Sequence, residues 1–263
     1  MQYSNYYPSS GMFHVSLPIL MGTRMDALLF GDDRGLLELA WEGMEKELRL
    51  LEKMLNRFDR ESEVTEVNNH AQLTAVRLSD GLWEILLDCR RYHEMTDGYF
   101  DITRKDFDQI VFMEEAQSIL FDQYGMLLDF GGYAKGYALK CLRKRLEEAG
   151  IKRALVNFGN SSVLALGTHP HGDSWSIGID AAADSFIPLR DASLSVSGNM
   201  PSREAHIVNP KTSELITGPQ MVAIVADDPV DAEVLTTAWI ASGQLDPPDW
   251  MLKFNLKKKY RIK

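Results

Sequence analysis

The spacing of hydrophobic positions changes along the chain, and the change predicts alternating strands and helices. Two runs, 13–20 and 24–30, are typical of strands and are separated by the turn Met21-Gly22-Thr23. Helical spacing follows over 36–55, where the apolar positions are Trp41, Met44, Leu48, Leu51 and Leu55. A charged loop is expected from Asn56 to Asn69. A second helix then begins at a Ser79 cap and continues through Met95.

The stretch 127–138 is the most informative part of the pattern. A short apolar run reads as a strand that ends at Asp129, a double glycine follows, and a long amphipathic helix begins. Glycines at such a corner let the backbone approach a ligand, and the first turn of a helix favours an anion, here beside Lys135. A tight turn with a solvated lysine is the more common meaning of such a corner. The spacing matches neither a Walker loop nor the dinucleotide fingerprint.

Strands dominate the remainder of the chain. They are predicted at 154–158, 174–179, 193–196, 206–208 and 221–226, and the basic tail 253–263 is either an edge strand or a frayed end. A last helix begins at the Asp228 cap, followed by proline. Within it Glu233 and Thr237 lie four positions apart and so share one face. Such a pair can hold a hard divalent cation, although a surface glutamate and a self-bonded threonine are more common.

Composition narrows the function classes. The chain has 263 residues, of which 45% are hydrophobic and 25% charged, as in an ordinary globular protein. No repeat or low-complexity linker divides it, so one packed unit is expected. The net charge of −10 argues against a general binder of nucleic acid or anionic membranes. Cys89 and Cys141 are expected to be free thiols, because the sequence has no disulfide framework and no zinc motif.

The first ten residues have neither a basic start nor an apolar segment. This predicts no signal peptide or lipobox, and hence a cytoplasmic location for the sequence as written. A periplasmic or membrane-anchored location would follow if the sequence had been trimmed. No later stretch is long and apolar enough to be read as a transmembrane segment.

Taken in order, the short motifs resemble the ApbE family, the FAD:protein FMN transferases. The matching stretches are Met21-Gly22-Thr23; Leu55-Asn56 with Ser62-Glu63-Val64; Gly98-Tyr99-Phe100-Asp101-Ile102-Thr103; Asp129-Phe130-Gly131-Gly132-Tyr133-Ala134-Lys135-Gly136-Tyr137-Ala138; Val156-Asn157-Phe158-Gly159; Trp175-Ser176-Ile177-Gly178-Ile179; Ser197-Gly198; His206-Ile207-Val208-Asn209-Pro210-Lys211-Thr212; and Ala232-Glu233-Val234-Leu235-Thr236-Thr237-Ala238. Each is short, but all occur in the family's order over nearly the whole chain.

The resemblance implies an α+β, T-fold-like architecture with antiparallel sheets and packed helices. Residues 1–263 would form a single domain of two tightly packed lobes, with FAD at their junction. The implied activity is magnesium-dependent transfer of FMN from FAD to a threonine or serine hydroxyl of a target protein, with release of AMP. A divergent relative that binds FAD or hydrolyses it to FMN and AMP is an alternative, and a non-enzymatic binding domain is another.

The resemblance also implies the site residues. Magnesium would be held by the Ala134 carbonyl, Glu233 and Thr237. Lys135 and His206 are the candidate catalytic residues, with an orienting hydrogen bond as the alternative role for His206. The implied FAD-binding set is Met21, Asp101, Asp129, Gly131, Gly132, Ala134, Lys135, Gly136, Ser197, Gly198 and His206.

The chain also departs from the family pattern. Glu233 and Lys140 stand where aspartates are usual, and Gly159-Asn160-Ser161 replaces a double glycine. Ser213 replaces another glycine. The segment 104–126 is short, so any lid over the flavin would be short as well. These departures are the reason for keeping the divergent FAD-binding relative as an alternative.

Overall fold

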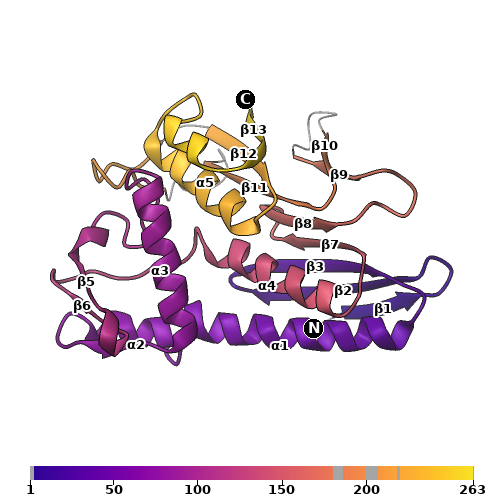
Figure 1. The fold of residues 1–263 in the computed structure, drawn as a ribbon, viewed down its shortest axis with the longest axis horizontal. Coiled ribbons are helices and arrows are strands. Elements are labelled where there is room, and N and C mark those ends of the chain that lie inside the picture. The colour runs from indigo at the N-terminus through magenta and orange to yellow at the C-terminus, as the bar shows by residue number, and fades with distance from the viewer. Residues whose placement is uncertain (1–2, 180–185, 200–206, 218–219, 263) are drawn as a thin grey trace.

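An eight-stranded antiparallel sheet forms the centre of the computed structural model, which describes residues 3–179, 186–199, 207–217 and 220–262. Figure 1 shows the sheet with helices packed against it, which confirms the α+β class. The strands, in spatial order, are β1 (Tyr3–Tyr7), β2 (Met12–Leu20), β3 (Thr23–Phe30), β7 (Arg153–Phe158), β8 (Ser162–Leu166), β11 (Ala192–Asn199), β12 (Gln220–Ala226) and β13 (Leu256–Ile262). The basic tail is therefore an edge strand.

Three helices lie together against this sheet. They are α1 (Arg34–Leu55), α4 (Ala134–Glu148) and α5 (Pro229–Ser242), and α4 contacts both of the others. Figure 1 shows α4 between α1 and α5, while α5 packs on β11 and β12. The helices begin close to their predicted positions, because Asp33 and Asp228 accept hydrogen bonds from the first turns of α1 and α5. None of the helices in the described ranges is long and apolar enough to cross a membrane.

The strand β8 is buried on both faces, which explains why the sequence pattern missed it. Leu164 and Leu166 face the core under α1 and α4. Val163 and Ala165 face a separate cluster formed with a two-stranded sheet, β9 (Trp175–Gly178) and β10 (Phe186–Leu189). A strand covered on both sides has no alternation of apolar and polar positions, so its period cannot be read.

A third group of elements shares one hydrophobic core with α5. It contains α2 (Glu63–His70), α3 (Asp80–Met95) and the small sheet of β4 (Val76–Arg77), β6 (Ser118–Phe121) and β5 (Ile110–Met113), with short 3-10 helices at Phe107–Gln109, Glu114–Ala116 and Asp249–Lys253. The charged loop predicted through Asn69 was wrong at its end, because residues from Glu63 form α2. Ser62 caps this helix, and Val64 and Val67 are its buried residues.

The strand expected before Asp129 is also absent, since residues 126–130 carry no strand pairing. The extended chain is held by a side chain instead. The Asn68 amide donates to the Leu128 carbonyl at 3.0 Å, and its oxygen accepts from the Leu128 N–H at 2.7 Å. Beyond the central sheet, Val208 forms only an isolated bridge with Leu215, where residues 206–208 had been expected to be a strand.

Candidate functional site

A cavity of about 650 Å³ opens where the β2–β3 turn, the turn that leads into α4, the end of β11 and one face of α5 meet. Ten residues of the predicted site line it: Met21, Asp101, Asp129, Gly131, Gly132, Lys135, Ser197, Gly198, Glu233 and Thr237. Ala134 and Gly136 are part of the first turn of α4 but do not line the cavity. His206 lies outside the described residues, so its catalytic role remains a prediction.

Two glycines allow the starts of α4 and α5 to approach each other. A Cβ on Gly136 would lie 2.7 Å from the Glu233 Cβ and from the Pro229 carbonyl oxygen. A Cβ on Gly132 would lie 2.9 Å from the Thr237 Cγ2. Both distances are shorter than carbon atoms tolerate, so only glycine permits this contact. The glycines therefore serve helix packing, and the packing brings Lys135 and Glu233 together.

Ion pairs on the outside of the two helices support the same contact. Lys140 Nζ lies 2.6 Å from an Asp228 carboxylate oxygen. Arg143 donates to the Asp227 carbonyl at 2.6 Å. The cap of α5 is thus tied to α4. The charge of Lys140 is thus neutralised by an aspartate that the chain supplies itself.

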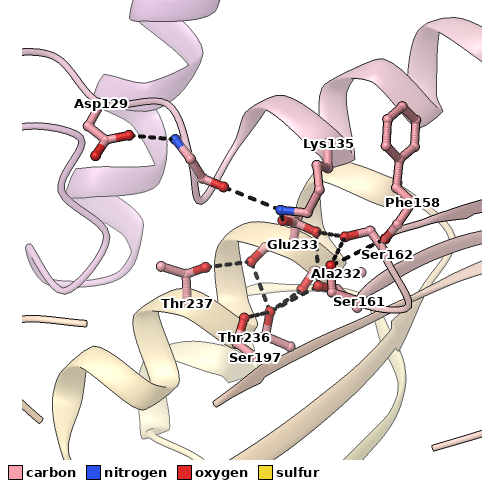
Figure 2. Close-up of polar contacts among 12 residues, drawn as sticks. Asp129, Lys135, Phe158, Ser161, Ser162, Ser197, Ala232, Glu233, Thr236 and Thr237 are labelled. Carbon is pink, nitrogen blue, oxygen red and sulfur yellow. Dashed lines mark hydrogen bonds and ion pairs between the residues drawn. The ribbon is translucent and has the colours of Figure 1, made fainter. Parts of the chain in front are cut away.

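Glu233 is a buried carboxylate whose two oxygens both have partners (Figure 2). Lys135 Nζ lies 2.5 Å from Oε1. Ser162 and Ser195 donate to Oε2 at 2.5 and 3.0 Å. A buried carboxylate is tolerated only when its charge and lone pairs are satisfied, and here an ammonium and two hydroxyls do this.

A chain of hydroxyls extends from this carboxylate along β11 and α5 (Figure 2). Ser197 donates to Thr236 Oγ1 at 2.9 Å, and Thr236 in turn bonds back to the Glu233 carbonyl at 2.9 Å. Thr237 Oγ1 donates to the same carbonyl at 3.1 Å. Thr237 therefore makes the hydrogen bond to its own helix backbone that is the more common role of such a threonine. Its side chain nevertheless lines the cavity, and its oxygen keeps lone pairs.

Asp129 organises the turn that leads into α4. Its Oδ1 accepts from the Gly131 N–H at 3.0 Å (Figure 2). Its Oδ2 lies 3.0 Å from Arg104 Nη2 and 3.2 Å from Arg57 Nε. Lys135 Nζ is 3.4 Å from the Gly131 carbonyl on the other side of the turn. Two cationic side chains of the cavity therefore flank one glycine turn.

Asp101 and Met21 also line the cavity. Burial raises the pKa of the Asp101 carboxyl, against the lowering effect of hydrogen bonds from Thr103. Met21 has a left-handed backbone with φ of 48°, and its N–H donates to Glu52 of α1 at 3.0 Å. The β2–β3 turn is thus anchored to α1, which fixes one wall of the cavity.

The donors present suit a hard cation only in part. No group of three histidine, cysteine or acidic side chains occurs in the described residues, so a metal ion would need hydroxyl and backbone oxygens as well. Glu233 and Thr237 supply such oxygens in one cavity. Glu233 Oε1 already pairs with Lys135, so a cation bound there has to share or displace this ammonium.

Sequence reasoning missed several residues of the site. Ser162, Ser195 and Thr236 complete the Glu233 network, while Arg57 and Arg104 bind Asp129. The alternating serines of β11 were a signal, since small polar residues rarely alternate inside a buried strand. Nothing in the local sequence marks the two arginines, because their meeting depends on the packing of distant segments.

The chain matches the model of the ApbE family over residues 21–111 and 104–257. It is 29% identical over 147 residues to an FAD:protein FMN transferase of Rhodobacter capsulatus, covering 51% of this chain and 28% of the relative. A Klebsiella pneumoniae protein of the same name is 26% identical over 149 residues, covering 51% and 45%. The chain therefore spans less than half of these two relatives. A Chlamydia muridarum protein of that name is 23% identical over 246 residues, covering 78% and 77%.

Solved structures show the same fold. The flavin transferase ApbE from Vibrio cholerae superposes with a TM-score of 0.78 at 17% identity, covering 89% of this chain and 87% of that one. An ApbE protein from Thermotoga maritima gives a TM-score of 0.78 at 21% identity, covering 92% and 90%. Agreement at such low identity shows that the arrangement of sheet and helices is shared.

Proposed function

The chain belongs to the ApbE family, and from this premise we propose that it transfers FMN from FAD to a threonine or serine hydroxyl of a target protein and releases AMP. One observation carries the proposal. A single cavity contains Lys135, Glu233 and the Gly131–Gly132 turn, although these come from helices nearly a hundred positions apart. Its volume, about 650 Å³, is in the ordinary range for sites of cofactor size.

The charge of the cavity supports a role for a divalent cation. Three carboxylates (Asp101, Asp129, Glu233) and two cations (Arg104, Lys135) are among its lining residues, a formal excess of one negative charge. A dinucleotide brings about two more on its diphosphate. We propose that Glu233, Thr237 and the Ala134 carbonyl hold magnesium. The ion would neutralise diphosphate charge and acidify the attacking hydroxyl.

The protein's own residues have separate tasks in this reaction. Gly131 and Gly132 let the backbone approach the ligand, and Lys135 supplies a cation beside the turn. The acceptor oxygen bonds to the phosphorus of the FMN half, and the bond from that phosphorus to the AMP oxygen breaks. The hydroxyl proton passes to water or to the phosphate of the departing AMP, and AMP leaves with its own phosphate and the bridging oxygen. Hydrolysis to FMN and AMP is the same displacement with water as the acceptor.

Purified protein with FAD and magnesium, with and without a clarified cell extract, tests the proposal. Nucleotide release is followed by chromatography, and flavin attachment by fluorescence of denatured protein bands. Transfer gives AMP together with a fluorescent band, while hydrolysis gives AMP with free FMN. Flavin binding without AMP would leave only a binding protein, and the absence of FAD binding would refute every flavin function. Glu233→Ala should abolish AMP release, whereas the surface variant Gly43→Ala should not.

A further inference from the structure

Arg104 is a cationic residue of the cavity that none of the family-like motifs contains. It follows directly after Thr103 and begins the segment that is short in this chain. Its side chain is half exposed, lines the cavity and reaches Asp129 with Nη2 at 3.0 Å. The guanidinium has five N–H donors, so one hydrogen bond to Asp129 leaves others to face a ligand.

The backbone of Arg104 is strained. Its φ of 76° lies in the left-handed region, which glycine adopts freely and residues with a Cβ do not. A turn imposes this conformation: the Arg104 N–H donates to the Asp101 carbonyl at 3.1 Å, and Asp101 Oδ1 accepts two bonds of 2.7 Å from Thr103. A strained arginine where glycine would fit better indicates that the side chain is kept for a purpose other than stability.

The charges around Asp129 point to this purpose. Its Oδ2 is shared by Arg104 and Arg57, so one carboxylate meets two guanidinium groups. Arg57 does not line the cavity, whereas Arg104 does. One carboxylate cannot neutralise both guanidinium groups, and Arg104 is the one of the two that lies at the cavity. Lys135, the other lining cation, is already neutralised by Glu233 at 2.5 Å.

We propose that Arg104 is a specificity-determining residue that binds the phosphate groups of the dinucleotide. It stands across the Gly131 turn from Lys135, since Asp129 links it to the Gly131 N–H and Lys135 lies by the Gly131 carbonyl. Arginine suits this task, because its planar fork of donors matches phosphate oxygens. The identity of the ligand rests on the proposed function, whereas the position of the Arg104 guanidinium at the cavity rests on the structure.

The test compares Arg104→Gly with Arg57→Ala, each of which removes one guanidinium from Asp129. Dissociation constants are measured for FAD and riboflavin by flavin fluorescence and for ADP by calorimetry, and the melting temperature is recorded for each protein. Arg104→Gly should weaken FAD and ADP binding about tenfold, or about 1.4 kcal/mol, and leave riboflavin binding unchanged. Its melting temperature should stay the same or rise, because glycine relieves the strained φ. Arg57→Ala should keep the wild-type ratio of FAD to riboflavin affinity.

Equal weakening of riboflavin, or unchanged binding of FAD and ADP, would overturn the assignment of Arg104. The same ratio change in Arg57→Ala would also overturn it, because both arginines would then act only through Asp129. Wild-type protein that binds FAD but releases no AMP would refute the proposed function, while a selective loss in Arg104→Gly would still stand.

Discussion

Replacing Lys135 with methionine tests the electrostatic centre of the cavity. The substitution keeps most of the side-chain length but removes the charge that lies 2.5 Å from Glu233 Oε1. Opposite unit charges at that separation attract by roughly 7 kcal/mol at an effective dielectric constant of about 20. Desolvation of both groups offsets much of this attraction, so the net value of the pair is small compared with the cost of removing one partner alone.

That cost can be bounded from the structure. Loss of one partner of a buried pair typically destabilises a protein by about 3–5 kcal/mol. Here Lys135 is 19% exposed, so water can enter, and Glu233 keeps its bonds to Ser162 and Ser195. We therefore expect Lys135→Met to lower the free energy of unfolding by about 2 kcal/mol, below the range for a fully buried pair.

Urea unfolding of four proteins measures the interaction: wild type, Lys135→Met, Glu233→Gln and the double variant. Glutamine removes the buried charge, so the double variant should be more stable than the sum of the two losses implies, by about 1–2 kcal/mol. Agreement with simple additivity, within about 0.5 kcal/mol, would show that the ammonium and carboxylate do not interact as the structure describes.

Three further outcomes follow from the contacts around this pair. Ser162→Ala and Ser195→Ala should each lower the free energy of unfolding in urea by about 1–2 kcal/mol, since each removes a donor from a buried carboxylate. Ser193→Ala, on the same strand as Ser195, should cost little, because Ser193 Oγ is buried and has no hydrogen-bond partner among the described residues. Gly136→Ala should destabilise the protein by about 1–3 kcal/mol, because its Cβ would clash with α5. Gly43→Ala, whose Cβ meets no atom within 4 Å, should stabilise α1 by about 0.5–1 kcal/mol. A higher melting temperature for Gly136→Ala than for Gly43→Ala would contradict this packing. Burial raises the pKa of the Asp231 carboxyl, so its contribution to stability is present below the ordinary aspartate pKa and is lost as pH rises through the higher folded pKa. Asp231→Asn should remove this pH-dependent loss of stability. An unchanged pH dependence of unfolding from pH 4 to 7 in this variant would show that Asp231 is not its source.

The elements that sequence analysis located are those with local signals. Apolar spacing and a capping side chain, Asp33 in α1 and Asp228 in α5, set the positions of these two helices. Of the missed elements, β8 lacks such signals, and α2 has a cap at Ser62 but little apolar spacing. β8 is apolar on both faces because the β9–β10 sheet covers one of them, and α2 is short with only two buried residues. Whether such segments are ordered depends on neighbours that are distant in the sequence.

The residues of the site likewise divide into those with a local sequence signal and those brought together only by packing. Its motif residues were predictable because they are adjacent in sequence, as at Gly131, Gly132 and Lys135. Partners supplied by packing were not: Arg57 and Arg104 come from separate loops, and Ser162 and Ser195 come from adjacent strands of the central sheet. Glu233 was predicted as a metal ligand, with a surface glutamate as the alternative, whereas the structure buries it and its neutralising ammonium is visible only once α4 lies against α5.

Under the proposed function, the Lys135–Glu233 pair would also couple the binding of the metal ion and of the diphosphate in this cavity. The two serines hold Oε2, so Oε1 is the carboxylate atom for which Lys135 and a metal ion compete. A phosphate group beside the Gly131 turn offers the ammonium a second partner and weakens its hold on Oε1. A divalent ion at Oε1 conversely releases the ammonium toward the phosphate. Thermodynamic linkage then requires each ligand to raise the affinity of the other by the same factor. An ammonium that pairs with Glu233 would therefore favour joint binding of the two ligands over binding of either alone.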